Sequence, residues 1–312
     1  MKARRRGLRR IGDVDLPKHV KTGGFDHAAV HGRSGRIYVA HTANDAVDVI
    51  DGAAGKHVGS IPDLPAVAGA LVSDEHDLVF TSNRGENTIG MFRPVDEPRV
   101  EKVRVGVRPN GLAYDPGRGR LLAANVGDPL QPRSFTVSIV DVAAKAMIAD
   151  LPVAGRTRWA VFDAAAGAFH VNIADPPVIV VIDADTLRQR VTFEIPAAGP
   201  HGLDLDAVGR RLFCACDAGR LVEVHADSGE VLRTAELSGV PDVVFFNPPR
   251  ARLYVAVGEP GVIDVFDTET LRRVDTIETE PGAHTTAFDA HGQTLYAFLP
   301  RSHRAAVYRE TA

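Results

Sequence analysis

The chain has 312 residues, of which 45% are hydrophobic and 24% charged, and its formal net charge is −4. This composition is typical of a globular protein and excludes a disordered or collagen-like chain. The longest apolar run, Leu64 to Val72, is far shorter than the roughly 18 residues that a membrane-spanning helix needs, so we expect no membrane span.

The chain begins with a basic segment, MKARRRGLRR, whose six positive charges leave a net charge of about −10 on the remaining residues. An acidic body argues against nucleic acid as the partner of the main domain. Because no apolar stretch of the kind found in a secretion signal follows, we expect a cytoplasmic protein, with Cys214 and Cys216 reduced and buried. We interpret residues 1–10 as a solvated tail and residues 11–312 as one domain.

Seven segments after this tail follow one template with a period of about 43 residues. Each opens with an apolar run that ends at a polar or acidic anchor residue. In chain order these runs are Phe25–His31, Ala66–Ser73, Pro109–Asp115, Thr157–Asp163, Pro200–Asp206, Pro241–Asn247 and Ala283–Asp289. Two further runs rich in Val, Ile, Tyr and Phe follow each of them, and six repeats add a weaker fourth run, so the pattern predicts β-strands.

Four strands in each of seven repeats, with no room for crossover helices, predict an all-β fold, a seven-bladed β-propeller. The seventh repeat stops after its third strand, at Val307–Tyr308. We expect the N-terminal segment Ile11–Leu16 to supply the missing fourth strand, because this would close the ring and cover an open sheet edge.

Several repeats carry a recognisable signature, as in RIYVAH…AVDVID, RLLAAN…TVSIVD and RLYVAV…VIDVFD. This pattern resembles the YVTN-repeat, or YncE-like, family of seven-bladed propellers over residues 11–309. The resemblance implies the fold more directly than the function. It is compatible with a binding protein and, through relatives of lactone-processing propellers, with a lactonase-like enzyme.

The first strands of a propeller line its central channel, so the residue that opens each of them is expected at the channel mouth. Read round the ring, this position holds Asp26, Ala68, Asn110, Arg158, His201, Asp242 and His284. A purely structural position has no need of two His, two Asp and an Arg. We therefore expect a small-molecule or metal site here.

Three chemistries fit this ring. His201, Asp242 and His284 come from successive blades and have the ligand types of a divalent metal site. Alternatively, Arg158 would hold an anionic substrate while His201 or His284 acts as acid or base, as in a metal-assisted hydrolase of lactones or esters. The third interpretation is a wet channel mouth whose polar groups bond only loop amides.

Neighbouring positions supply further candidates. His27 follows Asp26, and Trp159 follows Arg158 where most counterparts are small, so it would stack on a ligand or plug the channel. The second strands end at His41, Asn83, Asn125, Asn172, Asp217 and Glu259. We interpret the Asn residues as turn formers, and we expect His41 to face the mouth and join the ligand-binding set.

Other functional classes lack their motifs. The chain has no G-x-S-x-G, G-x-x-x-x-G-K-[ST], G-x-G-x-x-G, H-E-x-x-H or C-x-x-C-H sequence, so we expect neither a nucleotide nor a haem cofactor. A protein-interaction platform is the remaining alternative, and the polar mouth disfavours it.

Overall fold

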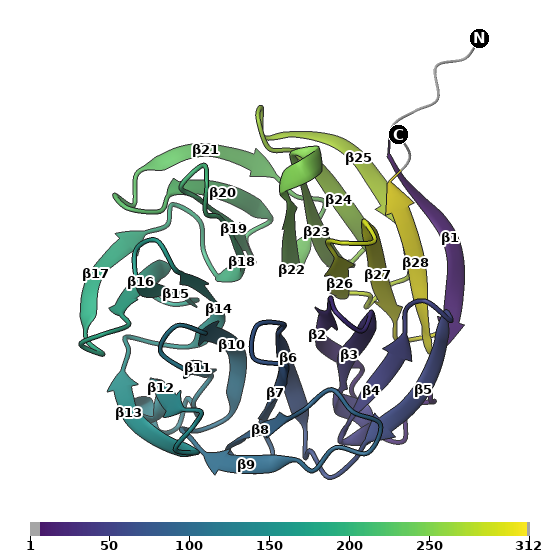
Figure 1. Cartoon of the computed structure of the whole chain (residues 1–312). Helices are drawn as coiled ribbons and strands as arrows, with labels where there is room; N and C mark the ends of the chain where they lie inside the picture. The colour runs from purple at the N-terminus through teal and green to yellow at the C-terminus, as the bar shows by residue number, and fades with distance from the viewer. Residues whose placement is uncertain (1–6, 311–312) are drawn as a thin grey trace.

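The computed structural model describes residues 7–310, which form seven four-stranded antiparallel sheets arranged as a ring (Figure 1). Each sheet is one repeat of the sequence, with its first strand at the channel and its fourth strand on the outside. The predicted seven-bladed β-propeller is confirmed. Residues 7–310 contain three single-turn 3-10 helices and no α-helix.

The blades are numbered from the N-terminal side of the chain. Blade 1 consists of β2 (Phe25–His31), β3 (Arg36–His41), β4 (Ala46–Asp51) and β5 (Lys56–Ile61). Blade 2 consists of β6 (Val67–Ser73), β7 (Leu78–Asn83), β8 (Thr88–Phe92) and β9 (Glu101–Arg104). Blade 3 consists of β10 (Pro109–Asp115), β11 (Arg120–Asn125), β12 (Thr136–Asp141) and β13 (Ala146–Pro152). Blade 4 consists of β14 (Thr157–Asp163), β15 (Ala168–Ile173), β16 (Val178–Asp183) and β17 (Gln189–Glu194).

The remaining three blades complete the ring. Blade 5 consists of β18 (Pro200–Asp206), β19 (Arg211–Cys216), β20 (Arg220–His225) and β21 (Val231–Glu236). Blade 6 consists of β22 (Val240–Asn247), β23 (Arg252–Glu259), β24 (Val262–Asp267) and β25 (Arg272–Glu278). Blade 7 consists of β26 (Thr285–Asp289), β27 (Thr294–Leu299), β28 (Arg304–Glu310) and β1 (Leu8–Asp15). The 3-10 helices are η1 (Thr42–Asn44), η2 (Pro132–Ser134) and η3 (Pro248–Arg250).

The anchor residues end the first strands because their side chains build the following turns. Asp206 accepts a hydrogen bond from the Gly209 backbone N–H at 2.9 Å, and Asp163 accepts one from Ala166 at 3.2 Å. A short acidic side chain can thus replace the backbone partner that a tight turn removes. This explains why the same residue type recurs at the same point of several repeats.

The ring is closed by β1, which pairs with β28 and so makes the N-terminal segment the fourth strand of blade 7, as predicted. β1 begins at Leu8 instead of Ile11, because Leu8 is itself buried against Tyr254 and Tyr308. The first six residues of the expected basic tail lie outside the described residues.

Apolar packing is distributed around the ring. Among the described residues, seven clusters of buried side chains occupy the seven interfaces between neighbouring blades. The cluster between blades 7 and 1 contains Val14 of β1 together with Phe25 and Phe298. Closure by β1 therefore buries apolar surface as well as pairing a sheet edge.

Cys214 and Cys216 are free and buried, with their sulfur atoms 3.8 Å apart on one face of β19. Within residues 7–310 no helix has the length and apolar character needed to cross a bilayer.

Three histidines meet at the seam between blades 7 and 1. The ring of His19, which follows β1, lies 4.9 Å from that of His41 and 4.5 Å from that of His303. The His19 Nε2, His41 Nε2 and His303 Nδ1 atoms are buried and have no hydrogen-bond partner among the described residues. Burial, followed by the nearby His41 and His303, lowers the pKa of His19.

Acidification is therefore expected to destabilise this seam. Because the pKa of His19 is lower in the folded protein, the unfolded chain takes up a proton first as the pH falls below about 6.5, and stability is lost. A His19→Phe variant keeps an aromatic ring but cannot titrate. Its melting temperature should therefore fall less between pH 7.5 and pH 5.5 than that of the wild type. Equal losses in the two proteins would contradict this role for His19.

Candidate functional site at the channel mouth

The first strands converge closely around the channel axis at the mouth. A Cβ atom at Gly111 would lie 2.3 Å from the Arg158 carbonyl oxygen, and one at Gly202 would lie 2.0 Å from the Asp242 carbonyl oxygen. Glycine directly after the residue that opens the first strand therefore lets the strands of neighbouring blades approach each other closely. The side chains of the ring position are brought together over this narrow point.

One half of the mouth is a histidine–carboxylate network. His201 Nδ1 lies 2.7 Å from Asp217 Oδ1, and its Nε2 lies 3.3 Å from Asp242 Oδ1. The other oxygen of Asp242, Oδ2, lies 2.7 Å from His284 Nδ1. The predicted trio of His201, Asp242 and His284 is thus a connected group.

The other half of the mouth is rich in arginine. Arg158 donates from Nη2 to Asp217 Oδ2 at 3.0 Å, and its Nη1 lies 3.1 Å from His201 Nε2. Arg84 reaches over the small Ala68 position from the turn after β7. Its Nη2 donates to Asn110 Oδ1 at 2.7 Å and lies 3.2 Å from Asp26 Oδ2.

Two further arginines, Arg108 and Arg156, lie exposed in the loops that lead into β10 and β14. Partial desolvation by its surroundings, followed by the charges of Arg158, Arg84 and Arg108, lowers the pKa of Arg156. Arg156 is therefore near enough to the other three guanidinium groups for their charges to act on it.

The pKa values of His284 and Asp242, in the histidine half of the mouth, differ strongly from their ordinary values. Burial alone would lower the pKa of His284, but the Asp242 carboxylate, which accepts its Nδ1–H, outweighs burial and raises the pKa to about 9. Burial also opposes ionisation of Asp242, yet His201 and His284 hold the pKa of that carboxyl well below its usual range. His284 is accordingly a cation at neutral pH, with 37% of its side chain exposed.

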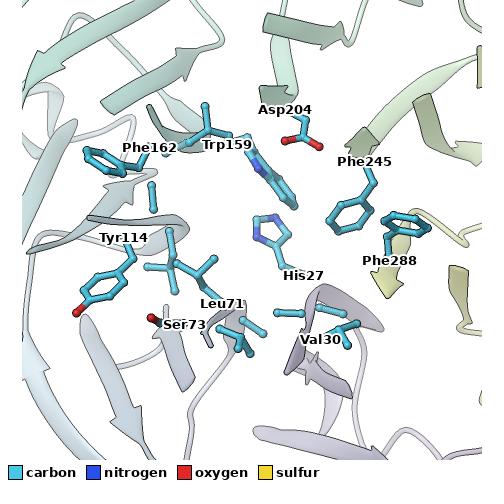
Figure 2. A pocket seen from close by; sticks show the side chains of 18 of the residues that line it. His27, Val30, Leu71, Ser73, Tyr114, Trp159, Phe162, Asp204, Phe245 and Phe288 are labelled. Carbon is cyan, nitrogen blue, oxygen red and sulfur yellow. The ribbon is translucent and has the colours of Figure 1, made fainter. Parts of the chain in front are cut away.

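His27 and Trp159 lie one layer below the ring. They come from blades 1 and 4, and their rings meet across the channel with centroids 4.1 Å apart (Figure 2). Burial is the main cause of a lowered pKa at His27, so the ring stays neutral. The pair forms the floor of the mouth.

His41 is placed elsewhere. It is fully buried, with its Nδ1 2.7 Å from Asp48 Oδ2, and belongs to the histidine seam between blades 7 and 1. The structure therefore does not bring His41 to the ring that Asp26, Asn110, Arg158, His201, Asp242 and His284 form.

The sequence comparison finds two curated relatives. A stretch of 186 residues is 23% identical to "Uncharacterized protein YncE" of Salmonella typhimurium, covering 45% of this chain and 53% of the relative. The protein of the same name from Salmonella typhi matches equally, with the same coverage. The match thus spans about half the length of these relatives, and no family model matches the chain.

Together with the seven four-stranded blades, this similarity supports a YncE-like arrangement. The chain is a seven-bladed β-propeller that is similar to YncE over part of its length.

Solved structures agree with the fold of this YncE-like propeller. A chain in "Crystal Structure of Mitotic Checkpoint Complex" superimposes with a TM-score of 0.82 at 12% identity, over 99% of this chain and 94% of that one. A chain of Kuenenia stuttgartiensis hydrazine synthase gives 0.81 at 14% identity, over 95% and 98%. At these identities the likeness shows the fold alone.

The mouth of the YncE-like propeller includes two residues outside the predicted site. The sequence pattern places Asp217 at the end of a second strand without indicating a role at the mouth, and it does not indicate Arg84 directly. Both stand directly at or after the end of a second strand, in turns that open on the mouth. One sequence feature points to Arg84 indirectly. Ala68 is the only apolar residue among the seven that open the first strands, so blade 2 lacks a polar side chain at that position.

The Asp242–His284 pair gives a direct test of this electrostatic arrangement. In an Asp242→Asn variant, the partner that raises the pKa of His284 is lost while burial remains, so the pKa should fall from about 9 to 6.5 or below. NMR titration of the imidazole resonances would measure it.

The same pair predicts a pH dependence of stability. Since the folded-state pKa of His284 is raised, its contribution is complete below about pH 6.5 and is lost as the pH rises through about 9. The wild type should lose this stability between those values and Asp242→Asn should not. An unchanged His284 titration in the variant would contradict the account.

Proposed function

We propose that this YncE-like propeller binds a small organic anion, carrying one or more carboxylates, at the channel mouth. The observation that carries the proposal is that the mouth holds Arg84 and Arg158, each fixed by a carboxylate and each with a buried, unpaired Nε atom, together with the cationic His284.

The two inner arginines retain unused donors. The Nε atoms of Arg84 and Arg158 are buried and have no hydrogen-bond partner among the described residues. An unpaired buried donor is costly, and a planar carboxylate is a good partner for the fork of a guanidinium group. A bound carboxylate would therefore satisfy what the protein alone leaves unsatisfied.

The carboxylates of the mouth have a supporting role in this proposal. Asp26 lies against Arg84, and Asp217 lies against both Arg158 and His201. Each fixes the orientation of a cation while leaving its remaining N–H groups for a ligand. Preorganised donors of this kind lower the ordering cost of binding.

A divalent metal on His201, Asp242 and His284 remains a prediction. In the present arrangement both Nδ1 atoms lie at carboxylate oxygens, and the Arg158 guanidinium faces His201 Nε2. Within residues 7–310 no group of three His, Cys, Asp or Glu side chains is arranged to hold a metal ion. Metal binding would require Arg158 to move away, which makes the anion the better-supported ligand.

Hydrolysis of a lactone or ester is the second candidate, and the Asp217–His201 pair favours it. With Nδ1–H donated to Asp217, Nε2 is the nitrogen of His201 that would accept a proton as a general base once a ligand displaces Arg158. Hydrolysis of γ-butyrolactone or p-nitrophenyl acetate that disappears in His201→Ala would support an enzyme. Activity that also disappears with chelator would support the metal-assisted form.

Binding of the anion can be measured by calorimetry on chelator-treated protein, with citrate, succinate and inorganic phosphate as probes and glycerol as the neutral comparison. We expect a carboxylate to bind, and Arg84→Gln or Arg158→Gln to weaken it roughly 10- to 100-fold, as expected for loss of a charge-assisted hydrogen bond.

Arg93→Gln is the matched control, because it removes the same charge from an exposed position in the turn after β8, on the opposite face. Carboxylate affinity that is absent at millimolar concentration, or that all three variants reduce equally, would refute the proposal. Stoichiometric Zn²⁺ binding lost in His201→Ala and His284→Ala would favour the metal site instead.

A further inference from the structure

A chamber lies on the other side of the His27–Trp159 contact from the charged mouth. It is a cavity of about 530 Å³ whose lining includes Asp74, Glu75 and Pro116, in the turns after the first strands. Its size falls in the range of small-molecule sites. Its walls are largely apolar and aromatic, formed by Leu71, Tyr114, Trp159, Phe162, Phe245 and Phe288 (Figure 2).

One carboxylate interrupts this apolar wall. The position two residues before each anchor holds, round the ring, Ala29, Leu71, Ala113, Val161, Asp204, Phe245 and Ala287. Six of these seven equivalent positions hold an apolar residue, so the propeller fold forms with an apolar side chain there. The fold alone therefore does not require Asp204 where it stands, and Figure 2 shows its carboxylate facing the chamber.

Asp204 is held without a cation. Its Oδ2 accepts the Phe246 backbone N–H at 2.6 Å, and its Oδ1 accepts the Leu205 N–H at 2.8 Å. Burial, outweighing these two bonds and supported by the charge of Asp206, raises its pKa to about 6. At neutral pH the chamber thus contains a partly desolvated carboxylate that lacks a positive partner among the groups acting on it.

We propose that this chamber binds an amine with an apolar or aromatic body, placing its ammonium group on Asp204 and its body against Phe245, Phe288 and Trp159. An ammonium would supply the missing counter-charge, and aromatic faces attract cations as well as apolar groups. Asp74 and Glu75 also line the chamber, and Arg33 donates hydrogen bonds to their carbonyl oxygens, so the preference for a cation rests on Asp204 itself.

The two proposed sites are chemically opposite and physically separate. The mouth presents guanidinium groups to an anion, whereas the chamber presents one carboxylate among aromatic rings to a cation. The His27–Trp159 contact lies between them. The amine site does not rest on the anion site, and either can fail alone.

Trp159 offers a direct readout, because it is the only tryptophan of the chain and lines the chamber. The probes are 2-phenylethylamine, which is an ammonium ion at neutral pH, and 2-phenylethanol, its neutral counterpart. At pH 7.5 we expect saturable changes in tryptophan fluorescence, with the amine binding at least tenfold more tightly, on the order expected for one charge-assisted contact.

The pH arm of the experiment starts with the wild-type protein and adds two control variants. Between pH 7.5 and pH 5 the affinity for the amine should fall as Asp204 takes up a proton, while the affinity for the alcohol should not. The other titratable groups facing Asp204 or lining the chamber are Asp206, His27, Tyr114, Asp74 and Glu75. Asp74→Asn and Glu75→Gln should leave the midpoint of this transition in place.

Asp204→Asn should abolish the preference for the amine, whereas Glu194→Gln, exposed on the outer strand β17, should preserve it. Equal affinity for amine and alcohol in the wild type, amine affinity independent of pH, or no saturable fluorescence change at 10 mM amine would each overturn the proposal.

Discussion

The close approach of seven strands around one axis is the constraint on which the rest of this molecule depends. At Gly111 and Gly202 there is no space for a Cβ atom, because the carbonyl oxygen of the next blade occupies it. Side chains at the preceding ring position are therefore forced together from blades far apart in sequence. His27 and Trp159, the two large residues at the position that holds glycine in three other blades, meet across the axis between the charged mouth and the apolar cavity.

This division explains how one fold presents two unlike environments. Above the His27–Trp159 pair, charged side chains from six blades compensate one another, and each carboxylate lies against an arginine or histidine. Below it, aromatic side chains surround the carboxylate of Asp204, and Asp74 and Glu75 lie in the turns at the edge of the cavity. Burying charge is costly unless it is paired, so the paired network above and the unpaired carboxylate below call for different ligands.

The repeat predicted the blades, their order and the closure by the N-terminal strand, because strand periodicity and turn residues act locally in sequence. It also predicted which residues open the first strands, so Asp26, Asn110, Arg158, His201, Asp242 and His284 were recognisable in advance. It could not predict that Arg84 crosses above Ala68 to reach Asn110, because that contact depends on the path of a turn in three dimensions. His41 illustrates the converse: its place in the repeat suggested the mouth, but packing against Phe25 and bonding to Asp48 keep it buried at the seam.

The central claim is that the mouth recognises a carboxylate through the unpaired side-chain N–H groups of its inner arginines. The most direct measurement is an NMR titration of arginine Nε–H resonances with citrate, assigned through Arg84→Lys and Arg158→Lys variants. The account predicts that both resonances shift with one common saturation curve, while that of the exposed Arg93 does not. Resonances of Arg84 and Arg158 that remain fixed at saturating citrate would contradict it.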